Sequence, residues 1–354
     1  MSSFSFSSLR NCFSSPTEPA LLLAAAVFAA GAWLMPAWLA FLLTLAFAKG
    51  LVVLGVVIQM RAGLVSFGQA LFYCIGGYGV GLAAQSLGIS DAFALLALGT
   101  AAGVLLALAC GWLLTRYREI FYAMLTLALS MILYGVLVKS SALGSTDGFN
   151  VAPPSFLGWM PEGDARKQAV YLLAVFVATL VALGLHRFMV SSLGRVTEAV
   201  RENELRVEYL GLSPQRMLFA NYVVAAGVSA LGGGLTALAS GHIDPDMAIW
   251  TTSGEFVFIA ILGGTGHVVA PFIGAIVFSV IRTFAIQEAP NLWQMTLGVS
   301  LLALILFLPK GLWSLVARSK KTEVTGISSP VSKKGVGASP KGISSPVSEK
   351  GVRA

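Results

Sequence analysis

Apolar residues occupy ten long segments of this chain, separated by short polar connections. A run of about 20 apolar residues is what a helix needs to cross a bilayer, and backbone groups in hydrocarbon must be satisfied internally. The runs show no strict two-residue alternation, which favours helices over barrel strands. The pattern predicts an all-α, polytopic helical membrane protein with about 8–10 transmembrane helices. The segments are 20–36, 37–58, 64–86, 92–115, 120–140, 168–187, 217–240, 247–264, 268–286 and 292–309.

Composition agrees with this class, and the placement of the few charged residues indicates how the chain is oriented in the membrane. Hydrophobic residues make up 56% of the chain and charged residues only 11%. If the N-terminus is cytoplasmic, 18 of the 23 lysines and arginines fall on the cytoplasmic side, as basic residues do in membrane proteins. The sequence therefore predicts cytoplasmic N- and C-termini and an outer loop over residues 141–168. The net charge of +7 reflects this topology, and nucleic-acid binding is not indicated.

The two ends of the chain differ in composition from the membrane domain, which we place at residues 20–312. Residues 1–19 form a Ser-rich segment, and we expect a retained first membrane helix after it in preference to a cleaved signal. Residues 313–354 contain GISSPVSKKGV and its near copy GISSPVSEKGV. This basic stretch has the composition of a disordered cytoplasmic tail. It either touches anionic membrane lipid or is solvated without a role.

One internal stretch, GRVTEAVRENELRVEYLGLS (194–213), concentrates charge between apolar segments. It holds seven of the chain's 39 charged residues in twenty positions. Ser191 or Ser192 can cap a helix start, Gly211 can end it in a left-handed conformation, and Pro214 blocks continuation. The spacing predicts an amphipathic helix over 195–210, about 24 Å long. Its expected apolar stripe is Val196, Ala199, Val200, Val207 and Leu210, and Glu202 and Arg206 are expected to pair at i,i+4.

Three interpretations of this helix are open on physical grounds. In the first, the helix lies along the membrane surface, although its four glutamates suit anionic lipid poorly. In the second, it is an ordinary solvated connection. Alternatively, it docks a cytoplasmic partner, which we favour because a long connection with its own helix usually has a task. The connection as a whole spans residues 188–216.

The stretch resembles the cytoplasmic signature of permease subunits in branched-chain amino-acid ABC importers of the LivM type. Four other segments resemble the same family in the same order, namely GLVSFGQALFYCIGGY (63–78), FYAMLTLALS (121–130), LGGTGHVVAPFIGA (262–275) and LFLPKGL (306–312). In the charged stretch the matching positions, to which the resemblance assigns ATPase coupling, are Gly194, Arg195, Ala199, Arg201, Glu202, Asn203, Glu204, Gly211 and Leu212.

The resemblance implies a membrane permease subunit that is not itself an enzyme. The implied partners are separate ATP-binding subunits, a second permease subunit in a heterodimer, and a periplasmic substrate-binding protein, at the bacterial inner membrane. Implied substrates are branched-chain or other small amino acids, urea or short amides. The chain contains no GxxxxGK[ST] loop, so ATP bound in that way would need another polypeptide. In the outer loop, Asp147 and Val151 stand where the family usually has glycines.

Polar residues inside the apolar segments are candidates for the substrate path. Glu255 falls within segment 247–264, where an ionised carboxylate is costly and usually functional, unless it pairs with a backbone group or water. Ser66, Gln69 and Tyr73 are spaced three and four apart, which predicts one helix face. They line the path or form helix-to-helix hydrogen bonds.

Other residues and functions fit the sequence less well. Thr126 and Ser130 are interpreted as packing residues, and His267 as a loop residue. Cysteines and histidines show no metal or disulfide spacing, so no cofactor and no metal site is predicted. The absence of HExxH and GxSxG argues against a membrane enzyme. A stand-alone ion-coupled secondary transporter of small organic solutes remains the alternative function.

Overall fold

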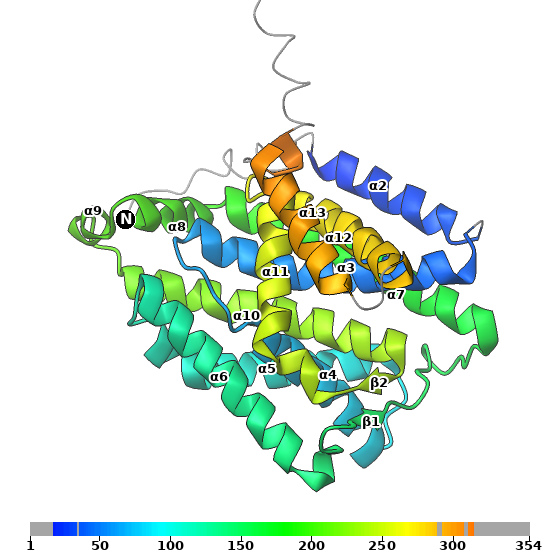
Figure 1. Ribbon diagram of the computed structural model, residues 1–354. Coiled ribbons are helices and arrows are strands. Elements are labelled where there is room, and N and C mark those ends of the chain that lie inside the picture. Colours follow the sequence, from blue (N-terminus) through cyan, green and yellow to red (C-terminus); the bar gives the residue numbers. More distant parts are fainter. Residues whose placement is uncertain (1–16, 34, 289–291, 308–310, 315–354) are drawn as a thin grey trace, which may run out of the picture. The chain divides into compact units, whose positions relative to one another are not determined.

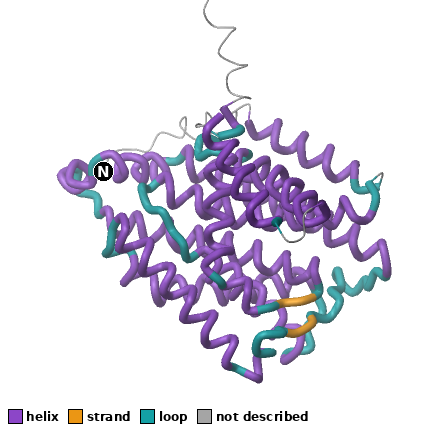
Figure 2. Tube along the Cα trace, viewed as in Figure 1, coloured by secondary structure: helices purple, strands orange, loops and turns teal. Residues whose placement is uncertain are grey.

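The computed structural model describes residues 17–33, 35–288, 292–307 and 311–314. The Ser-rich segment through residue 16 and the tail from residue 315, with its repeated motif and its expected lipid contact, lie outside the described residues. Within this part the chain is almost entirely helical (Figure 1, Figure 2), with one two-stranded antiparallel sheet. The predicted all-α class is confirmed.

The order of elements follows the apolar segments closely. The short elements are η2 (Ser141–Leu143), β1 (Phe149–Asn150), β2 (His242–Ile243) and η3 (Pro245–Ala248). The helices are α2 (Thr17–Gly31), α3 (Ala37–Arg61), α4 (Gln69–Ser86), α5 (Ala92–Leu114), α6 (Glu119–Lys139), α7 (Gly163–Val190), α8 (Ser192–Glu202), α9 (Glu204–Tyr209), α10 (Pro214–Ser240), α11 (Trp250–Gly263), α12 (Ala270–Glu288) and α13 (Trp293–Phe307).

Each of the ten apolar segments contains one of these helices, and the remaining two, α8 and α9, form the charged stretch. Among the described residues, six helices are long and apolar enough to cross a membrane: α3, α5, α6, α7, α10 and α12. Helices α2 and α11 are apolar but have only 15 and 14 residues, about 22 Å or less at 1.5 Å per residue. The chain is thus a multi-pass membrane protein with several shorter helices. The predicted orientation of its termini stays a prediction.

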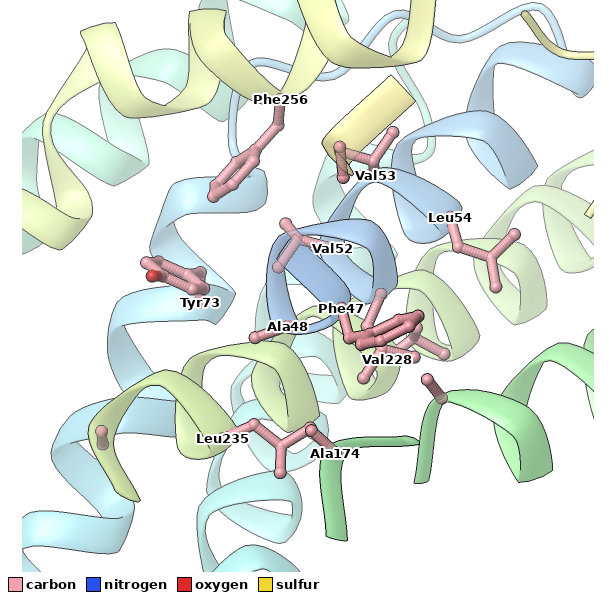
Figure 3. Packing of buried hydrophobic residues seen from close by; sticks show 14 of the residues in the cluster. Phe47, Ala48, Val52, Val53, Leu54, Tyr73, Ala174, Val228, Leu235 and Phe256 are labelled. Atoms are coloured by element: carbon pink, nitrogen blue, oxygen red, sulfur yellow. The ribbon is translucent and has the colours of Figure 1, made fainter. Parts of the chain in front are cut away.

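Helices α3 and α10 form the centre of the body. Helix α10 packs against α3, α4 and α5, and α3 also contacts α7 and α12. Val52 and Val53 on α3 are fully buried, as is Leu235 on α10. These side chains belong to one buried apolar cluster with Phe47 and Val228, and Figure 3 shows them distributed around α3. Residues 50–59 of α3 are buried on all sides, which explains why this part of the helix is apolar around its whole circumference.

Glycine allows the close approach of α10 to its neighbours. A Cβ atom at Gly76 on α4 would overlap the carbonyl oxygen of Ala230, and one at Gly233 on α10 would overlap that of Tyr73. A Cβ atom at Gly232 would lie 2.6 Å from the carbonyl oxygen of Ala48 on α3, also too close. Small residues at helix crossings let backbones come near enough for extensive dispersion contact. The glycine runs at 76–81 and 232–234 therefore serve packing.

The loop after α6 is joined to the end of α10 by the small sheet. Phe149 of β1 pairs with Ile243 of β2, and the Val151 amide donates to the Gly241 carbonyl at 2.9 Å. Val151 is buried, so its side chain fills space against the body. Gly148 has φ +67, and a Cβ atom there would overlap the Ile243 carbonyl oxygen, so only glycine fits this turn.

Candidate functional site

Two helices begin inside the body instead of at its ends. Before α4, residues 62–68 form a non-helical segment in which Leu64 and Ser66 are buried. Helix α11 follows β2 and η3 in the same way. Non-helical backbone at membrane depth is tolerated where protein buries it or where it lines a cavity. The starts of α4 and α11 are therefore the candidate positions for a substrate path through the membrane helices.

Side chains satisfy the backbone at these two starts. The Ala70 amide on α4 donates to Ser253 Oγ on α11 at 3.2 Å, and Ser130 Oγ on α6 donates to the Ala248 carbonyl at 2.7 Å. The Phe67 amide donates to Thr126 Oγ1 at 3.3 Å. Thr126 and Ser130 are both buried. Their predicted packing role agrees with these contacts, and the contacts join α4, α6 and α11.

A cavity of about 900 Å³ lies beside the start of α11. Its wall combines residues from α3, α4, α11, α12 and α13 with the segment that contains η3, and it is polar at several points. Its lining residues are Lys49, Tyr73, Asp244, Asp246, Met247, Ile249, Trp250, Thr251, Thr252, Gly254, Glu255, Phe258, Phe278, Arg282, Gln294, Leu297 and Gly298. Polar groups that converge within a largely apolar wall are typical of a binding site for small molecules.

Glu255 is the centre of an ion cluster in this wall. Lys49 Nζ on α3 lies 3.0 Å from Glu255 Oε2, and Arg282 Nη1 on α12 lies 2.9 Å from Glu255 Oε1. The side chains of Glu255 and Lys49 are only 19% and 14% exposed. The cluster connects three helices, and ionised groups within spans are rare and usually functional. The sequence analysis named Glu255, but it missed Arg282.

Tyr73 also reaches the cavity wall, whereas Ser66 and Gln69 do not line it. Tyr73 on α4 packs edge-to-face against Phe256 on α11, with ring centroids 5.2 Å apart (Figure 3). Gln69 is fully buried, and its Oε1 accepts a hydrogen bond from Ser229 Oγ on α10 at 2.6 Å. Ser66 accepts from the Gly68 amide at 3.2 Å.

The predicted common helix face of Ser66, Gln69 and Tyr73 is wrong, because α4 begins only at Gln69. Ser66 belongs to the preceding loop, and the helical spacing rule does not apply to it. The contacts of Ser66 and Gln69 are those of helix-to-helix and turn hydrogen bonds. Tyr73 and Glu255 are the two members of the predicted set that share the cavity.

The charged stretch forms two helices, and the prediction of one helix over 195–210 is wrong. Helix α8 begins after Ser191, whose side chain accepts from the Gly194 amide. At Asn203 the backbone is extended, with φ −160 and ψ 103, and its side-chain oxygen accepts from the Arg206 amide. Asn203 thus ends α8 and caps α9. Gly211 has φ +81, the left-handed conformation predicted for it. Pro214, predicted to block continuation of the charged helix, is the first residue of α10.

The break changes which residues form the apolar stripe. Val200 and Val207 are buried as predicted, but Leu210 is 74% exposed, and Ala199 is also exposed. Gly194 and Thr197 share the buried face of α8 with Val200, at a spacing of three residues. The backbone turn at Asn203 shifts the register of α9 relative to α8, so Leu210 no longer continues this face.

Two ion pairs connect this α8–α9 segment to the membrane helices. Arg61 at the end of α3 pairs with Glu198 on α8. Arg118, just before α6, makes a two-point contact with Glu204 on α9, Nη2 to Oε1 at 2.6 Å and Nε to Oε2 at 3.1 Å. Two parallel bonds of this kind fix direction as well as distance. The expected pairing of Glu202 with Arg206 is wrong: the glutamates of this described segment that form ion pairs are Glu198 and Glu204, and the break at Asn203 separates Glu202 from Arg206.

The rest of the α8–α9 segment is exposed. The predicted coupling residues Arg195, Arg201, Glu202 and Asn203 are exposed, and Gly194 is buried. Close to them, three large apolar side chains face outward, Leu205 at 64%, Tyr209 at 91% and Leu210 at 74% exposure. Exposed aromatic and aliphatic groups beside charges are typical of an interaction surface. Sequence reasoning assigned Leu210 to the buried face and passed over Leu205 and Tyr209.

Two histidines lie closer than their sequence positions suggest. The rings of His186 and His267 are 6.0 Å apart, and His267 stacks on Trp313 at 4.4 Å. His267 lies in the loop before α12, as predicted. Within the described part of the chain, no group of three His, Cys, Asp or Glu side chains is placed to hold a metal ion.

Comparison with known proteins gives consistent matches. The model of the family described as "Branched-chain amino acid transport system / permease component" matches residues 38–308. The LivM permease protein of the high-affinity branched-chain amino acid transport system of Escherichia coli K12 is 26% identical over 277 residues, 71% of this chain and 64% of LivM. This chain therefore matches somewhat less than two thirds of LivM.

Other relatives belong to the same kind of transport system. The LivH permease protein of Salmonella typhimurium is 26% identical over 266 residues, 71% of this chain and 85% of LivH. A probable LivM permease of Methanocaldococcus jannaschii is 24% identical over 178 residues, 46% of this chain and 51% of that protein. No solved structure gives a significant match.

Proposed function

This chain belongs to the family of branched-chain amino acid transport permease components, and on that premise we propose that it forms part of the membrane path of an ABC importer. The cargo is a branched-chain or other small amino acid, and urea and short amides are the competing classes. The observation that carries the proposal is the pair of features described above, a charged cavity among the spans and an exposed charged segment tied to the same helices.

The cavity wall needs a protein cover in the bilayer. Lys49, Glu255 and Arg282 are partly exposed, and charges that face hydrocarbon are costly. Trp250 and Phe258 on α11 line the same cavity and are 53% and 47% exposed. A second permease subunit over this face keeps lipid from the ion cluster, and the path then runs between the two subunits.

The α8–α9 segment receives the ATP-binding subunit in this proposal. Its exposed Tyr209 and Leu205 supply the apolar contact, and Arg201 and Glu202 supply charge. The positive-inside distribution of basic residues puts this surface in the cytoplasm of an inner-membrane protein. A periplasmic binding protein delivers cargo on the opposite face.

The ion pairs of the segment provide a route for motion. A displacement of α8 pulls on Arg61 through Glu198, and Arg61 is the last residue of α3. Because α3 also carries Lys49, this displacement reaches the ion cluster of the cavity along one continuous helix. Arg118 and Glu204 connect α9 to α6 in the same manner.

Substitution of the exposed charges tests the coupling role. We expect the double variant Arg201→Ala and Glu202→Ala to lose most ATP-dependent uptake of radiolabelled leucine and to co-purify less ATP-binding subunit. Arg166→Ala on α7, whose side chain is also exposed, is the control. If the double variant keeps both uptake and co-purification at wild-type level, the coupling role is wrong.

One observation also favours the alternative, an ion-coupled secondary transporter. A carboxylate shared by two cations inside the spans is the type of group that such transporters titrate. The two functions differ in their energy source. Leucine uptake that stops with an uncoupler while ATP is held constant supports the ion-coupled transporter, and uptake that persists supports the importer.

A further inference from the structure

A short turn between β1 and α7 exposes three large apolar side chains. Leu157 is 85% exposed, Trp159 59% and Met160 67%. Leu157 and Gly158 both have positive φ, +49 and +88. Across them, Phe156 and Trp159 exchange two backbone hydrogen bonds, at 2.8 and 2.9 Å. The three exposed side chains are therefore carried on a hydrogen-bonded turn and stay outside the packed interior.

The backbone of Leu157 has a conformation that leucine rarely adopts. At positive φ the Cβ atom of an L-residue comes too close to the following carbonyl oxygen, and two-residue turns of this kind favour Asn or Gly at the first position. The conformation is held by a hydrogen bond from the Leu157 amide to Asp91 Oδ1 at 3.1 Å. Packing inside the protein does not explain a leucine that is both strained and exposed, so its side chain indicates a contact outside the chain.

The turn is fixed to the first residue of a membrane-spanning helix. Asp91 immediately precedes α5. The Ala92 amide at the start of α5 donates to the Ser155 carbonyl at 2.8 Å. The Ser155 amide in turn donates to the Ser90 carbonyl at 2.7 Å. The end of α5 thus determines where the turn lies.

The length of α5 places both of its ends near the boundaries of the bilayer core. Its 23 residues extend about 34 Å at 1.5 Å per residue, slightly more than the hydrocarbon thickness of about 30 Å. Its exposed side is apolar throughout, as a lipid-facing helix requires. The large exposed side chains of α5 are Phe93, Leu98, Leu105, Leu108, Trp112 and Leu113.

Two exposed tryptophans lie near the two ends of α5. Trp112 comes 20 residues after Ala92, about 30 Å along the axis, and its ring lies 5.4 Å from the guanidinium of Arg116. Trp159 lies near the other end, because its turn is bonded to the start of the helix. Tryptophan is enriched at both membrane–water interfaces, which are separated by the same distance. A soluble partner does not require this spacing, whereas lipid does.

We propose that residues 156–160 form an interfacial anchor, which inserts Leu157, Trp159 and Met160 into the lipid boundary beside the start of α5. The partner is the bilayer at the level where headgroups meet acyl chains. Phe156 packs against the buried apolar cluster and joins the anchor to the body. The anchor fixes the depth of the loop that carries β1. It requires neither cargo nor an ATP-binding subunit and so stands apart from the proposed function.

Quenching by spin-labelled lipid tests the anchor in the full-length chain. Cys12→Ser and Cys110→Ala leave only the buried Cys74, and Leu157→Cys then receives the fluorophore NBD. The chain is placed in nanodiscs of phosphatidylethanolamine and phosphatidylglycerol, with or without phosphatidylcholine that carries a doxyl group near the headgroup. We expect the doxyl lipid to lower NBD emission about twofold or more, and aqueous iodide to have little effect.

The matched control lies in the same loop. Asp147 is exposed and polar, so NBD on an Asp147→Cys chain should be quenched by iodide and hardly by the doxyl lipid. A chain without an added cysteine measures labelling of Cys74. Met160→Cys repeats the test at a second exposed position and covers the case in which Leu157→Cys does not fold. Monodisperse elution identifies the chains that are folded.

A second set of variants removes lipid contact without removing the turn. Leu157→Asn suits the same backbone conformation, and Trp159→Ser removes the aromatic ring. Together, in the Met160→Cys chain, they should reduce quenching by the doxyl lipid about twofold. Unchanged quenching there overturns the anchor. So does a label at 157 that responds to iodide as strongly as the label at 147, which assigns the turn to water or to a soluble partner. Uptake measurements bear on the proposed function alone.

Discussion

The cavity wall and the α8–α9 segment are two charged regions of this largely apolar chain, and they differ in how their charges are surrounded. In the wall, Glu255 is 19% exposed and holds two cations from separate helices. In the segment, the paired side chains of Arg118 and Glu204 are 31% and 36% exposed. Removal of one partner from a buried cluster leaves uncompensated charge, whereas exposed pairs contribute little to stability. The same residue types are therefore largely enclosed by protein in one region and more open to solvent in the other.

The substitution Glu255→Gln tests the difference between the two regions most directly, and we expect it to have the largest effect on stability and uptake. The substitution leaves Lys49 and Arg282 close together without the carboxylate between them. We predict a loss of about 3–5 kcal/mol in the free energy of unfolding, measured by denaturant titration in detergent, together with loss of uptake. Glu202→Gln on exposed α8 is the control and should change the free energy of unfolding by about 0–1 kcal/mol. A Glu255→Gln variant as stable as this control would remove the distinction between the regions.

A packing variant measures how rigid the interior is beside the cavity. Gly233→Ala on α10 places a methyl group against the carbonyl of Tyr73, so one of the two helices must move. We expect destabilisation of about 1–3 kcal/mol from this overpacking. Gly135→Ala on α6 meets no atom within 4 Å and should be neutral or stabilise by about 0.5–1 kcal/mol. Equal unfolding midpoints for the two variants would show that the α4–α10 contact tolerates expansion.

The smallest change in stability is expected at the surface segment. Arg118→Ala removes the two-point contact with Glu204 and should alter the free energy of unfolding by no more than about 1 kcal/mol. We expect uptake per ATP hydrolysed to fall roughly fivefold, the equivalent of about 1 kcal/mol, because α9 loses its connection to α6. Arg116→Ala, whose guanidinium lies over Trp112 at 5.4 Å, is the neighbouring control. Full coupling in Arg118→Ala would show that this pair does not transmit motion.

Most of the fold could be predicted from the sequence because hydrophobic length is a strong signal in membranes. Each of the ten apolar segments contains a helix in the structure. The start of α4 was missed because residues 62–68 are as apolar as a helix but adopt an irregular path through the interior. Hydropathy does not distinguish these two backbones when protein surrounds both.

The site was predicted in part, and the sequence also contained a signal for Arg282, the residue that was not predicted. Glu255 was singled out as an intramembrane carboxylate, yet Arg282 carries the same signal as a cation within the apolar segment 268–286. Its pairing depends on α11 and α12 folding back against each other, which spacing along the chain does not reveal. In the charged stretch, Asn203 was read as an interior helix residue, although asparagine prefers the cap position that it occupies.

The interruption at Asn203 has a consequence for the order of assembly. Helix α8 has 11 residues and α9 has six, and isolated helices shorter than about 12–15 residues are marginal in water. Neither piece is therefore stable without the contacts that Arg61, Arg118 and the buried Val200 and Val207 provide. The surface proposed for the ATP-binding subunit comes into existence only after the membrane helices have come together. On the proposed function, recruitment of that subunit would act as a check on maturation, because the docking segment forms only on a folded membrane domain.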